Sequence, residues 1–257
     1  MSEDVFRIIT DRDMTYEEAA EYFKEKLDLT PKEFYRLQAK YRAQAFTVSG
    51  YSSMKMIQAF HDELTKAIED GISMGEFKRS MDDFLERNGY TKLHPLQAEN
   101  IFRTNVQTAY NVGAYEEMTR PAVMMARPYW RYDAVEDSRT RPAHRAMNGK
   151  VFPADSPVWD TWYPPNGFRC RCSVSTLSKR QVEQQGLKVE EKVPDRISTG
   201  MDMIPMIPDK DFNYNPAKTG FKPDLSDVPE PLRKAFERRE AQHREKPPTS
   251  QVAPQGG

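Results

Sequence analysis

The stretches "EDSRTRPAHRAMNGKVF" (residues 136–152) and "YPPNGFRCRC" (residues 163–172) are the most unusual part of this chain and decide how its second half is interpreted. Together they hold both cysteines and one of the four histidines. Amphipathic helices and half-buried strands need apolar residues at a regular period, and these stretches have almost none. Their composition therefore indicates a role other than filling a hydrophobic core.

The sequence before this segment predicts helices. Thr30-Pro31 with Glu33 has the pattern of an N-cap, a first-turn proline and an acidic first turn, which predicts a helix through residues 32–46. Further helices are expected where apolar residues recur on one face, with a capping box at Ser73 and Glu76 and a helix-opening proline at Pro95. We interpret residues 1–120 as a helical N-terminal domain, a bundle of about four elements.

Beyond Pro121 the pattern changes to short extended segments separated by Pro, Gly and Asn. Strands are expected in "PYWRYDAV" (128–135), "KVF" (150–152) and "CRCSVSTL" (170–177), followed by a small helix. We interpret residues 121–192 as a small, loop-rich α+β domain, so the fold class of the chain is α+β. Residues 193–257 are expected to form an extended proline-rich segment, a charged helix at 231–246 and a disordered tail at 247–257.

Charge and hydropathy limit the function classes. The chain has 38 basic and 39 acidic residues, so its total charge predicts no polyanion partner. The distribution is uneven, because residues 1–30 carry nine acidic and four basic side chains, whereas residues 120–175 carry nine basic and five acidic. No apolar run approaches the ~20 residues of a membrane helix, and the first residues are acidic rather than basic. We therefore expect synthesis in a cytoplasm and no membrane partner.

Four segments follow one another in the chain: "IFRTNVQTAYNVGAYEEM" (101–118), "DSRTRPAHRAMNGKVF" (137–152), "PPNGFRCRCSVSTLS" (164–178) and "DFNYNPA" (211–217). In this order they resemble one known family, the phage Mu F-like minor head proteins, also called phage head morphogenesis proteins. The resemblance implies a low-copy structural protein of a tailed phage or prophage. It also implies action in capsid assembly near the portal, a place in the virion, and a part in DNA packaging or ejection. Its implied partners are the portal protein and other head proteins.

The two cysteines are spaced Cys-x-Cys, which suits thiols or metal ligands better than a disulfide. If their segment is a strand, Cys170 and Cys172 project to one side, where His144 and a fourth ligand, Asp137 or Asp133, would complete a structural zinc site. The alternatives are a pair of small buried thiols beside a histidine bonded to backbone, or a cysteine nucleophile paired with His144.

Arg139, Arg141, Arg169 and Arg171 flank the Cys/His residues. Guanidinium groups suit phosphates and carboxylates, so these four are candidates for contact with the portal or for weak, non-specific DNA binding. The alternative is internal pairing with nearby acidic residues. The large aromatic residues Trp130, Trp159, Trp162 and Tyr163 are expected to form the core of the second half.

Polar residues 103–105 should anchor a loop to their helix. "FNYNP" (212–216) should dock an extended segment.

No catalytic constellation is recognised in the sequence, and we expect an assembly protein rather than an enzyme. The competing hypothesis is a metal- or thiol-dependent hydrolase-like or toxin-like module built on His144 and Cys170, because some relatives of the family carry fused toxin domains. The short sequence after "NYNPA" leaves little room for such a fusion, which favours the structural role.

Overall fold

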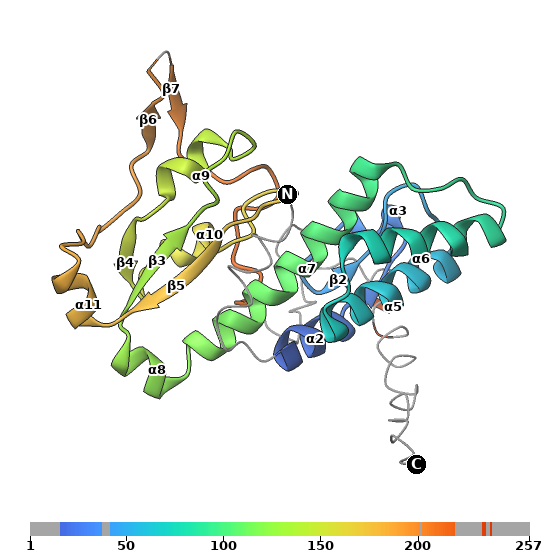
Figure 1. Cartoon of the computed structure of the whole chain (residues 1–257), viewed down its shortest axis with the longest axis horizontal. Coiled ribbons are helices and arrows are strands. Elements are labelled where there is room, and N and C mark those ends of the chain that lie inside the picture. The colour runs from blue at the N-terminus through green and yellow to red at the C-terminus, as the bar shows by residue number, and fades with distance from the viewer. Residues whose placement is uncertain (1–15, 38–41, 201, 219–232, 235–236, 238–257) are drawn as a thin grey trace.

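The computed structural model describes residues 16–37, 42–200, 202–218, 233–234 and 237. Two lobes lie on either side of one long helix (Figure 1). The predicted α+β class is confirmed. The elements, in order, are α2 (Tyr16–Lys24), β1 (Leu27–Asp28), α3 (Pro31–Phe34), β2 (Ala45–Phe46), α5 (Met54–Asp70), α6 (Met74–Arg87), α7 (Pro95–Met118), α8 (Pro121–Ala126), β3 (Tyr129–Asp133), α9 (Pro142–Met147), β4 (Val151–Pro153), α10 (Trp159–Trp162), β5 (Ser173–Leu177), α11 (Lys179–Gln184), β6 (Arg196–Ser198) and β7 (Met203–Pro205).

The first lobe packs α2, α5 and α6 against the first three-quarters of α7. The capping box of Ser73 and Glu76 begins α6 as predicted, and Gly71 ends α5 in the left-handed conformation. The apolar residues on one face of α5 are completely buried, at Ile57, Phe60, Leu64 and Ile68. Burial of such side chains contributes about 1.5–3 kcal/mol each. The buried members of this core all lie between residues 19 and 112, and none comes from the second lobe's sheet.

The helix predicted over residues 32–46 is wrong in its extent. In the described part of this stretch, α3 ends at Phe34, and Ala45–Phe46 forms a strand parallel to Leu27–Asp28. Both Ala45 and Phe46 are buried, and the carbonyls of Gln44 and Phe46 accept hydrogen bonds from the N–H groups of Leu27 and Leu29, each at 2.9 Å. Tertiary pairing has overridden the local helix propensity here.

The second lobe is built on an antiparallel sheet in the order β4-β3-β5. Trp130 lies opposite Phe152 on one side and Thr176 on the other. As predicted, Trp130, Trp159, Trp162 and Tyr163 are buried together in this lobe. Met118 and Tyr115 of α7 pack on the same cluster, so α7 contributes to the cores of both lobes.

The chain after residue 192 is partly regular. β6 and β7 form an antiparallel hairpin that projects from the second lobe (Figure 1), which the sequence did not predict. The other described residues up to residue 218 lie outside helices and strands, with turns at 210–211 and 216–218, whereas residues 233–234 and 237 are helical. The predicted helix at 231–246, apart from three residues, and the predicted tail at 247–257 lie outside the described residues.

Candidate metal centre

His144 lies in the last turn of α9, a short helix that Pro142 begins at its first position. Proline is suited to that position because it has no N–H to donate and its φ is already helical. The helix buries Met147 and His144, and the imidazole is only 2% exposed. Its ring contacts Trp162 edge-on. The aromatic core therefore holds this imidazole in place.

Cys170 and Cys172 lie in the loop that leads into β5, which begins only at Ser173. The expectation that they belong to the strand is wrong, because Arg169 takes a φ of 56° and turns the chain just before them. The turn is closed by the N–H of Cys170, which donates to the carbonyl of Gly167 at 3.2 Å. Both side chains are nevertheless buried, at 3% and 2% exposure.

The fold brings the histidine and both thiols together. Nδ1 of His144 lies 3.7 Å from Sγ of Cys170 and 3.6 Å from Sγ of Cys172. All three atoms lie within 4.8 Å of one another. Nε2, the other ring nitrogen, is buried and has no hydrogen-bond partner among the residues that the structure describes. The nitrogen that faces the sulfurs is thus Nδ1, almost equidistant from the two.

The two thiols have opposite electrostatic environments. The pKa of Cys170 is well below its usual value, chiefly because Cys172 donates a hydrogen bond to it and also because His144 stabilises the thiolate. The pKa of Cys172 is well above its usual value, because of its hydrogen bond to Cys170, its burial and the charge of Cys170. Two adjacent buried thiols favour one negative charge over two unless a cation lies between them.

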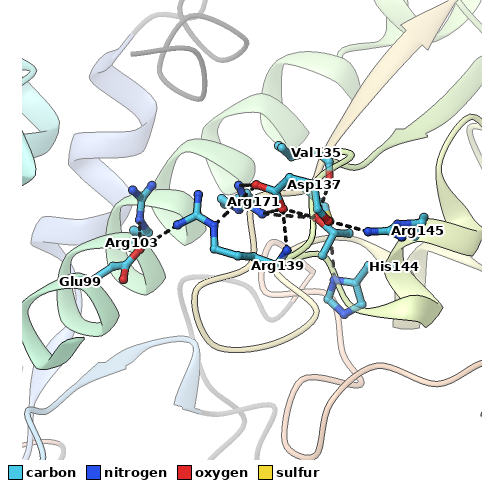
Figure 2. Close-up of polar contacts among 10 residues, drawn as sticks. Glu99, Arg103, Val135, Asp137, Arg139, His144, Arg145 and Arg171 are labelled. Carbon is cyan, nitrogen blue, oxygen red and sulfur yellow. Dashed lines mark hydrogen bonds and ion pairs between the residues drawn. The ribbon is translucent and has the colours of Figure 1, made fainter. Parts of the chain in front are cut away.

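Asp137, the expected fourth ligand, lies outside this cluster. Its carboxylate accepts two hydrogen bonds from the guanidinium of Arg171, at 2.6 and 2.5 Å, and a third from the backbone N–H of Arg139 (Figure 2). These contacts, the Arg171 pair first, hold the pKa of Asp137 far below its usual range. Asp133, the other expected candidate, pairs with Arg131. Neither carboxylate joins the sulfurs and the imidazole.

The four arginines differ in their contacts. Arg171 is bound to Asp137, and Arg141 pairs with Asp209 at 2.9 Å. Arg139 is 57% exposed in its side chain and reaches both Asp137 and Glu99 of α7 at longer range (Figure 2). The side chain of Arg169 is exposed, and among the described residues it has no ion-pair partner. Three of the four therefore serve at least partly as internal contacts.

Polar side chains of α7 anchor the cysteine loop. The amide groups of Gln107 and Asn111 both donate to the carbonyl of Cys172, at 3.2 and 3.3 Å. The hydroxyl of Thr104 accepts from the N–H of Arg169, which confirms the predicted loop-anchoring role for this residue. Sequence reasoning missed Gln107 and Asn111. Their spacing of four residues, which places two amide side chains on the same side of the helix, was the available signal.

The segment with Phe212 docks as expected. Phe212 packs edge-on against Phe168 at 4.9 Å between ring centroids, and Asn215 donates to the carbonyl of Trp159 at 3.0 Å. Tyr214 is half-buried, and the loss of water around its hydroxyl raises its pKa to about 12. This segment covers the loop that carries the cysteines.

Comparison with known proteins locates this centre within a family. Residues 58–175 match the family described as "Phage Mu protein F like protein". His144, Cys170, Cys172 and their anchors on α7 all lie in that range. Residues 58–175 belong to the Mu F-like family. The predicted resemblance is thereby confirmed.

Two relatives extend the Mu F-like match. The chain is 31% identical to "Putative capsid assembly protein F" of Escherichia phage Mu over 265 aligned positions, which cover 89% of this chain and 59% of the Mu protein. It is 35% identical to "Mu-like prophage FluMu F protein" of Haemophilus influenzae, covering 57% of this chain and 38% of that protein. The chain thus spans between about two-fifths and three-fifths of these relatives.

A third relative is an uncharacterized protein of Methanocaldococcus jannaschii. It is 30% identical, and the match covers 49% of this chain and 18% of that protein. No solved structure matches the chain. In the part of the chain that the structure describes, no helix combines the length and apolar character needed to cross a bilayer.

Proposed function

We propose that this Mu F-like chain is a minor structural protein that acts in assembling the head of a tailed phage or prophage. The observation that carries the proposal is its alignment with a phage protein named for capsid assembly, which runs through 89% of the chain. The alignment includes both lobes and the helix α7 that joins them. The proposed place of action is the virion, in contact with other head proteins.

The site supports an architectural role better than a thiol enzyme. A catalytic thiolate must reach its substrate, whereas Cys170 and Cys172 are 3% and 2% exposed and are covered by aromatic side chains. The loop that carries them is fixed to α7 through Gln107 and Asn111. A rigid, closed cluster of this kind suits a protein whose task is to hold a defined shape between partners.

More specifically, we propose that the portal protein binds to the basic side of the second lobe. Arg139 and Arg169 are exposed there, while Arg141 and Arg171 are paired with carboxylates. Exposed guanidinium groups can bind carboxylates of a protein or phosphates of DNA. The proposal names the portal protein as the partner. Weak, salt-sensitive retention of DNA is the alternative outcome.

The test uses the phage or prophage that encodes this chain. An amber mutation in the gene should lower the titre of infectious particles by at least about tenfold, and electron microscopy should show missing or misshapen heads. Mass spectrometry of wild-type virions should detect the protein at low copy. Particles that form normally and package DNA in the mutant would refute the assembly role.

The portal contact needs a separate test. Cross-linking mass spectrometry of wild-type heads should join the region around Arg139 and Arg169 to the portal protein. The double variant Arg139→Glu, Arg169→Glu should lose those cross-links, whereas Arg180→Glu, at an exposed position on α11, should keep them. Cross-links to other head proteins alone would refute the portal contact while leaving the assembly role intact.

A further inference from the structure

The cluster of His144, Cys170 and Cys172 has no role in the assembly surface, because all three side chains are buried. Burying these groups without a metal costs free energy, because an imidazole and two ionisable thiols then lie inside an aromatic core. Among the described residues, these three form the group whose ligand atoms could converge on one metal ion. Soft sulfur and nitrogen donors of this kind favour zinc over magnesium or calcium.

The distances match those of a tetrahedral zinc site. With Zn–S near 2.3 Å and Zn–N near 2.0–2.1 Å, the N···S edge of a regular tetrahedron is about 3.6 Å. The two N···S distances in the cluster are 3.7 and 3.6 Å. A hydrogen bond from an imidazole would normally favour one sulfur over the other. Near-equal distances instead suit a fourth atom that all three groups bind.

We propose that Nδ1 of His144 and the sulfurs of Cys170 and Cys172 bind one structural Zn²⁺ ion. The protein supplies three ligands, and the fourth position falls to a non-protein ligand such as water. Asp137 is not in the ligand set, because both of its oxygens bind Arg171. The ion ties α9 to the loop before β5, and the hydrogen bonds from Gln107 and Asn111 extend that tie to α7.

Charge balance supports the same assignment. Two thiolates that are buried side by side repel each other unless a cation lies between them. A divalent ion allows both to be thiolates, since coordination releases their protons. The buried cluster would then carry no net charge, with a neutral imidazole and two thiolates around Zn²⁺.

The experiment measures metal in the full chain, purified under reducing conditions without chelator. Elemental analysis should find about one zinc per chain. After removal of zinc and addition of Co²⁺, the protein should show thiolate-to-cobalt charge-transfer absorption and the intense visible bands of tetrahedral Co²⁺. Less than about a tenth of an equivalent of zinc, together with no such spectrum, would overturn the proposal.

Variants assign the ligands. His144→Gln and Cys170→Ser should lose most of the zinc, while His94→Gln, at an exposed histidine, should keep it. Asp137→Asn should keep it as well, and a loss there would overturn the three-ligand assignment. If the ligand variants fail to fold, the cobalt spectrum of the unaltered chain still decides whether the site exists. These measurements do not involve phage heads, so a failure here leaves the proposed assembly role standing.

Discussion

Arg171 and Asp137 show how a charged pair can decide which side chains reach a site. The guanidinium is only 8% exposed, so its partner is fixed by the need to neutralise a nearly buried cation. Asp137, which the sequence suggested as a metal ligand, therefore binds Arg171 and holds the cysteine loop instead.

We predict that Arg171→Gln lowers the free energy of unfolding by about 1–3 kcal/mol, because it removes a two-pronged charged contact and leaves Asp137 with weaker donors. Urea denaturation followed by tryptophan fluorescence would measure the loss. Arg180→Gln, the same change at an exposed arginine, should leave stability within about 0.5 kcal/mol of the unaltered chain. Equal effects at the two positions would contradict the structural role of the pair.

Lys26 makes a pH-dependent contribution to the free energy of unfolding. Burial lowers its pKa to about 7, and its amine lies between the hydroxyl of Tyr22 and the carbonyl of Ala43. In the unfolded chain a lysine titrates near 10.4. Between these values the unfolded state binds a proton that the folded state does not, so the contribution of Lys26 to stability rises with pH.

We predict that Lys26→Met flattens the dependence of the unfolding free energy on pH between 7 and 9. The lost slope should approach about 1.4 kcal/mol per pH unit. Urea denaturation at several pH values would measure it, with Lys179→Met, at an exposed lysine, as the matched control. A steeper slope in the Lys26 variant than in the unaltered chain would show that the sign is wrong.

At the scale of elements, the contact between α2 and α7 depends on a glycine. A Cβ atom at Gly113 would lie 3.0 Å from the backbone nitrogen of Ala19 and 3.4 Å from its Cα. Because these are backbone atoms of a packed helix, they cannot move aside as a flexible side chain would. The missing side chain lets the two helices approach closely.

We predict that Gly113→Val destabilises the chain by about 1–3 kcal/mol through displacement of α2. Gly75→Val is the matched control, since a Cβ there meets only side-chain atoms, at 3.8 Å or more. Thermal unfolding followed by circular dichroism would compare them. If Gly113→Val lost less stability than Gly75→Val, the close approach of α2 at this glycine would not matter for stability.

The long elements could be predicted from sequence because local signals and burial agree in them. In α6 the capping box, the apolar face and the terminal Asn-Gly all point to the same helix. The pair β1–β2 could not be found, since two-residue strands carry no period and their partners lie far apart in sequence. The projecting β6–β7 hairpin was missed because its inward residues are few.

Some residues of the candidate site could be predicted from the sequence and others could not. His144, Cys170 and Cys172 were expected together because they are soft ligands in segments poor in apolar residues, and the fold places them together. The partner of Asp137 could not be chosen from sequence, since four arginines compete for a few carboxylates. Gln107 and Asn111 were missed because a polar residue on a helix usually faces solvent.

At the scale of the whole molecule, α7 connects two hydrophobic cores. It packs against α5 and α6 and, at Gly113, against α2 (Figure 1). Near its end, Tyr115 packs against Trp130 and Tyr163 of the second lobe. The hydrogen bonds of Gln107 and Asn111 to Cys172 add a polar connection near the middle. Packing and polar contacts together should make the lobes unfold as one unit.

We predict that the double variant Gln107→Leu, Asn111→Leu weakens this coupling, because it leaves the carbonyl of Cys172 without these donors at a cost of about 1–3 kcal/mol. Hydrogen exchange should become faster in β3 and β5 while α5 and α6 keep their protection. Asn105→Leu is the control, since its amide bonds only to Ile101 within α7. Uniformly faster exchange in both lobes would contradict selective coupling.

The order of the two cores along the chain has a consequence for synthesis. The buried members of the first core all lie between residues 19 and 112, so they emerge from the ribosome before any strand of the three-stranded sheet does. At about 5–20 residues per second, the helical lobe has several seconds to pack before β5 emerges. The exposed end of α7 then offers Tyr115 and Met118 as the first apolar surface on which the later lobe can condense.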